Sequence, residues 1–352
     1  MNKISRLTKR IWLRLGRVTD QFFFQVLRAI PGGEVIYYSL CNSEFRREMK
    51  AVFRGRCQYA KEVAAPSDGN SFLRRNIHRI EKGLSMKERR ELFGLSFIDE
   101  TVEGFLALRA SRAGKGCGEM AEYEYFRDVL HEYFEVTARD PRSERSREKF
   151  ATALGGEECG SSIPYLRKLE APPSCSYDEL LDLAIRRRSV RFFKQKEVPR
   201  ELVEKAMTVG LYSASACNRQ PFSIRMFDDP ERVKELAGIP MGTGGYDHQI
   251  PCLAVVIGHL DAYFSERDRH LIYIDSSLAM TPFMLACETL GLSTCAINWP
   301  DMKQREKRMA EALELNQWEK PIMLMAIGYP DEEVVVPRST KKPVKEMMIW
   351  EK

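Results

Sequence analysis

Hydrophobic residues in the second half of the chain fall into blocks that predict alternating helices and strands. Two continuous apolar runs, Cys252–His259 and Pro321–Ile327, are bounded by proline or glycine, as in buried strands. Shorter strands are expected over Ser223–Phe227 and Ser293–Asn298. Helical spacing predicts helices over Asp178–Arg187, Arg200–Tyr212, Pro230–Ala237, Asp275–Leu290 and Met302–Leu313. This alternation predicts a layered α/β or α+β domain.

The preceding part of the chain has a different pattern, because residues 35–150 show mainly helical periodicity and little strand-like alternation. Phe97–Leu108 and Tyr123–Val136 are the clearest helical segments. Gly83 is expected to end a helix in the left-handed conformation, which glycine adopts cheaply. Ser85 is expected to cap the next helix, with Glu88 completing a capping box.

A histidine in this helical region stands among cations. His78 is close in sequence to Arg74, Arg75 and Arg79. Such a group can meet an anionic ligand, and such a histidine can equally be a packed or surface residue.

The two patterns are separated by a stretch rich in glycine, proline and serine. Gly155, Gly156, Gly160, Pro164 and Pro172 belong to it. Such composition marks a boundary that few contacts cross. We therefore expect a helical N-terminal region over residues 1–150, a linker over 151–175 and a second domain over 176–352.

The N-terminus predicts a basic amphipathic helix over residues 3–28. Its apolar stripe consists of Ile4, Leu7, Ile11, Leu15, Val18, Phe22 and Val26. Seven cations against one acid give residues 1–30 a net charge of +6, although the whole chain carries only +5. A helix of this kind can lie on an anionic membrane surface, or can dock on its own domain or a partner with its basic face in water. No apolar run reaches the roughly 18–20 residues that span a bilayer.

Composition narrows the class of protein. With 352 residues, 44% hydrophobic and 30% charged, the chain resembles ordinary globular proteins. Its nine cysteines form no CxxC pair, which argues against a disulfide framework and for a reducing cytoplasm. Five histidines without an HExxH motif give no reason to expect a metal site. The cations gather at the N-terminus rather than on a folded face, so no nucleic-acid partner is expected.

Two short motifs about 25 residues apart carry the candidate chemistry. The first, Arg186–Phe193, places several arginines and Ser189 at the end of a predicted helix. The second, Ser213–Phe222, is a turn of small residues that ends in two amides, a proline and an aromatic ring. A phosphate needs cations and backbone amides, and a flat heteroaromatic ring needs polar groups at its edge. Each motif alone is usually a solvated helix end or a plain turn.

Together, and in this order, the motifs resemble the FMN-binding signature of the nitroreductase family. The second is similar to the family's Pro-Ser-x-x-Asn-x-Gln-Pro-Trp segment, with Ala214 in place of proline and Phe222 in place of tryptophan. The predicted helix ending at Gly291 and the Gly328-Tyr329-Pro330 turn resemble further family markers. The resemblance covers about half of the chain, from Ser176 to the end, and implies a three-layer α+β fold, a central mixed sheet flanked by helices.

The resemblance also implies roles for individual residues. Arg187, Arg188 and Ser189 would hold the FMN phosphate or ribityl chain, and Arg191 would lie near the ring. Ser215, Asn218 and Gln220 would contact the flavin from the partner subunit of a homodimer. Arg191 and Asn218 are the candidate catalytic residues. Ser293 and Thr294 are further cofactor candidates, as are Lys341 and Lys342, although the arginine usual in the family is absent there.

The family's chemistry is ping-pong transfer of electrons from NAD(P)H through FMN to a small acceptor such as a nitroaromatic or quinone. The loop Met241–Tyr246 either borders the acceptor pocket or is a plain surface loop. The Arg188–Phe192 string also resembles the family's deiodinase branch, whereas Asn218-Arg219-Gln220 follows the nitroreductase type. The alternative is a non-catalytic flavin-fold scaffold or membrane-surface assembly protein, with a weak association to surface-polysaccharide pathways.

Overall fold

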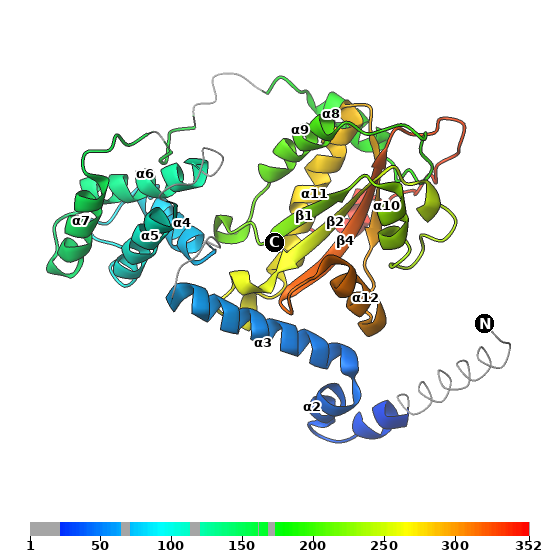
Figure 1. Cartoon of the computed structure of the whole chain (residues 1–352), viewed down its shortest axis with the longest axis horizontal. Helices are drawn as coiled ribbons and strands as arrows, with labels where there is room; N and C mark the ends of the chain where they lie inside the picture. The colour runs from blue at the N-terminus through cyan, green and yellow to red at the C-terminus, as the bar shows by residue number, and fades with distance from the viewer. Residues whose placement is uncertain (1–21, 65–70, 113–119, 161, 168–172, 352) are drawn as a thin grey trace.

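The computed structural model describes residues 22–64, 71–112, 120–160, 162–167 and 173–351, and shows a helical N-terminal part beside an α+β part (Figure 1). Most of the basic helix expected over 3–28 lies outside these residues; within them, 22–27 are helical. The helical part comprises α2 (Gly33–Ile36), the π-helical turn η1 (Tyr37–Cys41), α3 (Ser43–Ala64), α4 (Ser71–Leu84), α5 (Ile98–Arg112), α6 (Met120–Val136) and α7 (Pro141–Leu154). Among the described helices, none is both long and apolar enough to cross a membrane.

The α+β part alternates helices and strands as the hydrophobic pattern predicts. Its helices are α8 (Tyr177–Arg186), α9 (Arg200–Leu211), α10 (Pro230–Ala237), α11 (Leu271–Thr289), α12 (Lys303–Leu313) and α13 (Val344–Met347). Its strands are β1 (Phe222–Phe227), β2 (Cys252–His259), β3 (Ser293–Asn298) and β4 (Glu319–Gly328). Short 3-10 turns lie at η3 (Ala216–Asn218), η4 (Asp247–Gln249), η5 (Leu260–Ala262) and η6 (Glu266–Asp268).

The four strands form one sheet in the order β1-β2-β4-β3, with every neighbouring pair antiparallel. Phe222 of β1 lies opposite Gly258 of β2, at one end of the sheet. Cys252 of β2 lies opposite Ile327 of β4, at the other end. The parallel component of the expected mixed sheet is an isolated bridge between Ser189 and Thr294 at the β3 edge.

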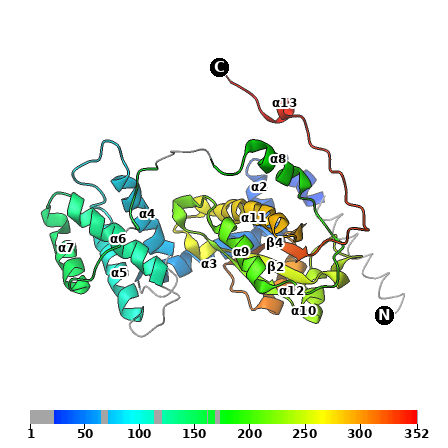
Figure 2. The same ribbon diagram turned by 90° about the horizontal axis from the view of Figure 1, so that it is seen from above.

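Helices cover both faces of the sheet, which makes three layers (Figure 2). Alternate residues of β2 face opposite ways, as the pleat requires. Cys252, Ala254 and Val256 pack with α9 and α11, whereas Leu253 and Val255 pack with α10 and α12. This double burial explains why β2 reads as a continuous apolar run rather than an alternating one.

Helix α3 joins the helical part to the sheet. Ala51 belongs to the core on the α11 side. Gly55 touches the backbone of η5 so closely that a Cβ there would lie 2.7 Å from the Leu260 carbonyl carbon. The helix therefore needs glycine at this position for close packing.

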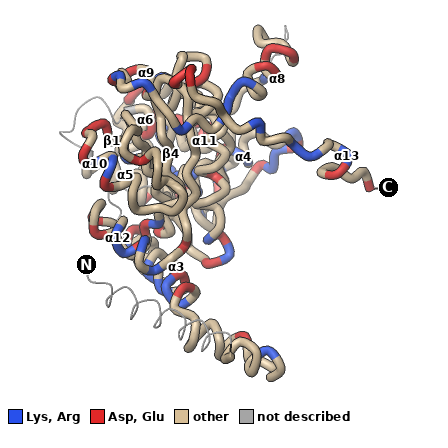
Figure 3. The backbone as a smooth tube through the Cα atoms, turned by 90° about the vertical axis from the view of Figure 1, so that its right-hand side faces the viewer, with Lys and Arg blue, Asp and Glu red and all other residues tan. Residues whose placement is uncertain are grey.

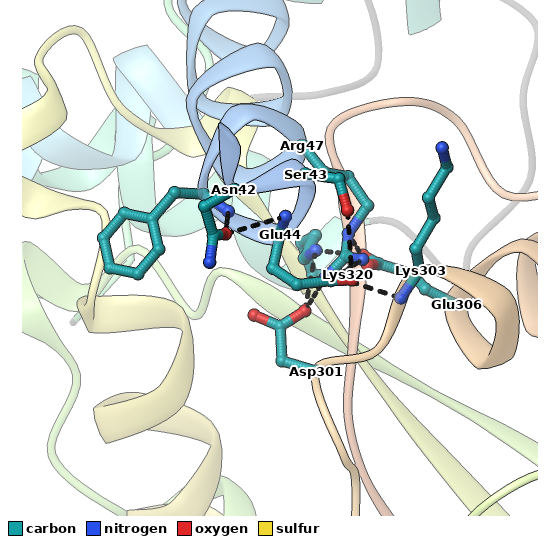
Figure 4. Close-up of polar contacts among 9 residues, drawn as sticks. Asn42, Ser43, Glu44, Arg47, Asp301, Lys303, Glu306 and Lys320 are labelled. Atoms are coloured by element: carbon teal, nitrogen blue, oxygen red, sulfur yellow. Dashed lines mark hydrogen bonds and ion pairs between the residues drawn. The ribbon is translucent and has the colours of Figure 1, made fainter. Parts of the chain in front are cut away.

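An ion-pair cluster holds the start of α3 to the end of the sheet (Figure 4). Asn42 Oδ1 caps α3 by accepting hydrogen bonds from the backbone N–H groups of Glu44 and Phe45, both at 3.0 Å. Arg47 pairs with Asp301 and with Glu306, which also pairs with buried Lys320 of β4. The N-terminal part is thus attached to the α+β part by polar contacts as well as by packing.

The helical part also has its own core of aromatic and aliphatic side chains from α4 to α7. Two expectations in this region were wrong. No helix follows Ser85, whose hydroxyl instead donates to the Glu81 carbonyl at 2.6 Å. Gly83 lies inside α4 and has no left-handed conformation; a Cβ there would meet the Phe93 ring at 2.2 Å, so packing selects glycine.

Element boundaries otherwise agree closely with the pattern. Helix α11 begins at Leu271, four residues before its expected start. Ser176 caps α8 as expected and forms a capping box with Glu179, whose carboxylate accepts from the Ser176 backbone N–H at 2.7 Å. Helix α7 continues to Leu154, so irregular chain begins at Gly155. The proposed domain limits remain a prediction.

Where η5 meets α3, a buried carboxyl predicts a pH dependence of stability. Burial, reinforced by Glu62, raises the pKa of Asp261 to about 7, and its Oδ1 has no partner in the described part of the chain. Because the pKa in the folded state exceeds the ordinary aspartate pKa of 3.8, this group stabilises the fold below about pH 4 and loses that contribution as pH rises through 7. The Asp261→Asn variant should therefore remove a fall in unfolding free energy on the order of 3 kcal/mol between pH 4 and 8. Urea unfolding at both pH values measures this change. An equal change of unfolding free energy with pH in the variant and in the unsubstituted protein would contradict the prediction.

Candidate functional site

The first group of predicted site residues lies where the chain leaves α8. Helix α8 ends at Arg186, and the chain then runs extended beside β3. The Val190 backbone N–H donates to the Thr294 carbonyl at 3.0 Å, and Ser189 bridges Thr294. The structure thus brings Ser189 and Thr294 together, although they are 105 positions apart in the sequence.

This first half-site carries unneutralised positive charge. Arg187, Arg188 and Arg191 have no carboxylate ion pair among the described residues. Arg188 Nη1 donates to the Arg338 carbonyl at 2.9 Å, and Arg191 Nη1 to the Ser189 carbonyl at 3.3 Å. Cations that form no ion pair with a carboxylate are suited to an anionic ligand.

Two hydroxyls lie at the start of β3. Thr294 is fully buried, and its Oγ1 has no partner in the described chain. Ser293 instead donates to Glu288 Oε1 at 3.1 Å. Burial raises the pKa of Glu288, while the Ser293 hydrogen bond and the nearby Arg186 and Arg187 oppose the rise. Thr294 is therefore the hydroxyl of this pair whose hydrogen-bonding capacity is unused in the described chain.

Tyr246 adds to this half-site, although the sequence singled it out only as the end of the loop Met241–Tyr246. Burial raises its pKa, and nearby Cys295 adds to the rise, whereas Arg191 opposes it. Tyr246 ends the Met241–Tyr246 loop, so this loop reaches Arg191. A pocket of about 160 Å³ lies between Ser189–Phe192 and residues 331–337. Pockets for cofactors usually measure about 300–1,000 Å³, so this one is too small by itself.

The second half-site is the turn before β1, and its backbone is strained. Cys217, Asn218 and Gln220 have φ angles of 54°, 50° and 51°, in the left-handed region that residues other than glycine seldom adopt. Such outliers persist only where the surroundings enforce them, and they cluster at functional sites.

Buried Asp275 of α11 enforces this turn. Its Oδ2 accepts from Ser215 Oγ at 2.6 Å and from the Ala216 backbone N–H at 2.9 Å. Ser215 Oγ in turn accepts from the Gln220 backbone N–H at 2.8 Å. The predicted flavin residue Ser215 is thus a tether of the turn in this structure.

The two amides of the turn lie together. Gln220 Nε2 donates to Asn218 Oδ1 at 2.9 Å. The helical part supports them from outside, since Arg74 Nη1 of α4 donates to the Asn218 carbonyl at 3.2 Å. Neither Asp275 nor Arg74 carried a sequence signal that linked it to the site; both meet the turn only through the tertiary fold.

The two half-sites lie at opposite corners of the sheet. The turn leads into Phe222 on edge strand β1, at the Gly258 end of β2. Ser293 begins the other edge strand, β3, at the Cys252 end of β2. Six residues of strand separate these ends, which amounts to about 20 Å along the strands and about 14 Å across them. One chain therefore does not bring Arg191 and Asn218 together.

The last predicted pair, Lys341 and Lys342, is exposed on the C-terminal tail, which runs away from the body (Figure 3). No contact joins these lysines to the arginine motif in the described chain. Within the described residues, no cluster of His, Cys, Asp or Glu side chains is arranged to hold a metal ion.

The residue set fits FMN when the two half-sites are considered together. The unpaired arginines and the orphaned Thr294 hydroxyl suit a phosphate, and the paired amides of the turn suit the polar edge of a ring.

Comparison with known proteins shows which family the residues of this site resemble. The model of the Nitroreductase family matches residues 184–244 and 242–329, which include both half-sites. Residues 184–329 are a nitroreductase-family domain. The match supports an oxidoreductase of the FMN-dependent type as the general class, and the helical part lies outside the matched residues.

Several curated relatives share this domain at low identity. An iodotyrosine deiodinase from Nematostella vectensis is 23% identical over 235 residues, which cover 58% of this chain and 88% of the relative. A putative NADH dehydrogenase/NAD(P)H nitroreductase from Archaeoglobus fulgidus is 23% identical, with 44% and 88% covered. An NADPH-dependent oxidoreductase from Staphylococcus haemolyticus is 27% identical, with 46% and 69% covered.

Solved structures of similar proteins overlap with about half of the chain. An FMN-dependent nitroreductase from Clostridium difficile R20291 is 22% identical, with a TM-score of 0.42 over 48% of this chain and 98% of that one. A putative nitroreductase in complex with FMN from Desulfovibrio desulfuricans is 20% identical, with a TM-score of 0.43 over 50% and 99%.

Proposed function

We propose that this protein is a homodimeric oxidoreductase that passes electrons from NAD(P)H through FMN to a small organic acceptor, of nitro or quinone type or specific to its pathway. The observation that carries the proposal is the diagonal separation of the half-sites within one chain. In a symmetric dimer, the arginine half-site of one copy can face the amide turn of the other, and two equal sites result.

Exposed apolar faces near the sheet support such a dimer. None of the residues of α8 is buried, and Leu180 and Ile185 expose half or more of their surface. Ile274 and Leu278 of α11 are 50% and 46% exposed, one turn apart on the same helix. Unpartnered apolar faces of this kind mark association surfaces.

Each half-site has a role in this proposal. Arg187, Arg188, Ser189 and Thr294 would hold the phosphate, and Lys341 and Lys342 of the tail would add charge there. The positive charge of Arg191 would stabilise the ring when it is reduced, and Asn218 and Gln220 of the second copy would fix its polar edge. Bound FMN would supply ping-pong hydride chemistry, accepting a hydride from the nicotinamide and passing the electrons on after the oxidised donor has left.

An absorption spectrum of the purified protein, followed anaerobically by NADH or NADPH, tests this function. We expect flavin peaks that bleach on addition of one donor and return with an acceptor. A protein that lacks flavin and takes up no added FMN would contradict the proposal. Nitrofurazone, menadione and iodotyrosine as acceptors would then separate the nitro, quinone and dehalogenation reactions.

A scaffold without turnover, held at a membrane surface, is the second candidate, and one observation favours it. Large apolar side chains between positions 22 and 40 are 44–68% exposed on a segment that extends away from the body (Figure 3): Phe22, Phe23, Phe24, Val26, Ile30, Val35, Ile36 and Leu40. They continue the basic segment of residues 3–28, which supports contact with anionic lipid. Bound FMN that no donor reduces, together with sedimentation on anionic vesicles, would favour this candidate.

A further inference from the structure

Helix α4 of the added helical part lies against the amide turn of the flavin half-site. Arg74 bonds the Asn218 carbonyl and is itself neutralised by Glu122, with 2.6 Å between Arg74 Nε and Glu122 Oε1. Helix α4 therefore packs against the turn that carries Asn218, and Arg79 of this helix is close enough to Cys217 of the turn to interact with it.

Two further arginines of α4 are held together without an acid. Arg75 Nη1 and Arg79 Nη1 both donate to Asn76 Oδ1, at 3.4 and 3.2 Å. Asn76 is fully buried, and its Nδ2 donates to Glu100 Oε1 at 2.9 Å, which fixes the amide. Neither arginine has a carboxylate within ion-pair distance in the described chain. A neutral oxygen thus holds two like charges that repel each other.

Aromatic rings orient these guanidinium groups. The Arg75 guanidinium carbon lies 4.5 Å from the centre of the Phe264 ring, and that of Arg79 lies 3.6 Å from the centre of the Phe97 ring. Both arginines are only half-buried. Stacking covers one face of each guanidinium and leaves N–H groups at its edge for an incoming anion. Burial and the charge of Arg75 lower the pKa of Arg79, and the more distant carboxylate of Glu100 opposes this fall only in part.

A third cation lies at the same contact between α4 and the amide turn. Arg219 follows Asn218 and is 4% exposed. Its closest acid is Asp268, at 3.6 Å, and its buried Nε has no partner in the described chain. Burial raises the pKa of Tyr59, and Arg75 and Arg219 both oppose the rise, so both lie near this one hydroxyl.

We infer that Arg75 and Arg79, supported by Arg219, form an anion-binding subsite that holds a carboxylate or phosphate group of the molecule reacting at the flavin. This inference rests on the proposed function and adds that the reacting molecule carries a negative charge. The anionic group belongs either to the acceptor or to the phosphates of the nicotinamide donor. The helical part thereby selects charged reactants.

Binding of a charged and a neutral probe tests the subsite without turnover. The probes are 4-nitrobenzoate and 4-nitrobenzamide, which differ mainly in charge, together with inorganic phosphate. The experiment uses the full-length protein loaded with FMN, or the apoprotein if FMN does not bind. Its thermal stability should rise with nitrobenzoate or phosphate but not with nitrobenzamide. The Arg75→Gln/Arg79→Gln variant should lose this gain, and Arg75→Lys should retain part of it. The control Arg308→Gln, at an exposed arginine of α12, should keep it.

Kinetics then identify the source of the anion. If it belongs to the acceptor, the double variant should raise KM for nitrobenzoate about tenfold or more and leave KM for nitrobenzamide unchanged. If it belongs to the donor, KM for NADH or NADPH should rise by a similar factor instead. A double variant that is folded and equals the original chain in stabilisation by anions and in all KM values overturns the inference. Absence of turnover would contradict the proposed function alone, because the binding experiment tests the anion subsite independently of turnover.

Discussion

Two variants that each bind FMN weakly are expected to regain one site of normal affinity when they are combined in one dimer. Arg191→Ala damages the arginine half-site, and Asn218→Ala damages the amide turn at the opposite corner of the sheet. Each loss of a charged or buried hydrogen-bonding group should weaken FMN by about 1.5–3 kcal/mol, or roughly tenfold to a hundredfold. In the heterodimer, one site carries both substitutions and the other carries neither. The second site should therefore be intact.

Co-expression with two different affinity tags isolates this heterodimer. We expect about half of the wild-type flavin per dimer, and the same fraction of donor-dependent bleaching. The matched control combines Arg191→Ala with Arg188→Ala, which damage the same half-site. Every site of that heterodimer contains one substitution, so no recovery is expected. Equal flavin content in the two heterodimers would mean that the site lies within one chain.

Removal of the Asp275 carboxylate should destabilise the domain and abolish FMN binding together. Asp275→Ala leaves the Ser215 hydroxyl and the Ala216 N–H without their acceptor. Unpaired buried donors cost about 1–3 kcal/mol each, so we expect the unfolding free energy to fall by about 2–4 kcal/mol. The left-handed residues Cys217 and Asn218 also lose the tether that enforces their conformation, and the amides should leave the positions that the ring requires.

Urea unfolding and FMN titration measure both effects. Asp275→Asn keeps one acceptor oxygen and nearly the same shape, so it should retain part of the stability and of the affinity. Ser215→Ala removes one hydrogen bond of the tether and should have a smaller effect than Asp275→Ala. A stable Asp275→Ala protein with unchanged FMN affinity would show that the turn does not depend on this carboxylate.

Most of the α+β part could be predicted from the sequence because its signals are local. The strand Cys252–His259 and the helix Pro230–Ala237 were predicted to the residue, since a continuous apolar run and a proline at the first helical turn specify them without reference to distant contacts. Predictions failed where packing overrides local preference. Gly83 looked like a helix end, but it is in α4 because the Phe93 ring leaves no space for a Cβ.

The candidate site also has features that local sequence predicts and features that only the tertiary fold reveals. Arginines, a hydroxyl and amides at family spacing predict the two half-sites from the sequence. Their partners could not be found in this way, because hydrogen bonds such as Ser215 to Asp275 join positions 60 residues apart. The sequence already marked Arg74, Arg75 and Arg79 as a group that can meet an anion, but Arg74 is 144 residues from Asn218, and only the fold places α4 against the turn.

The sequence by itself therefore determined the chemical groups, the order of helices and strands, and the family, since these depend on residue type and short-range periodicity. Only the tertiary structure decided where the groups lie. Sheet order and register place the two half-sites at opposite corners of one chain, which is the basis for proposing a dimer. The packing of α3 and α4 then brings the arginines of the added helical part to that site, because close contacts between distant segments leave no trace in local sequence.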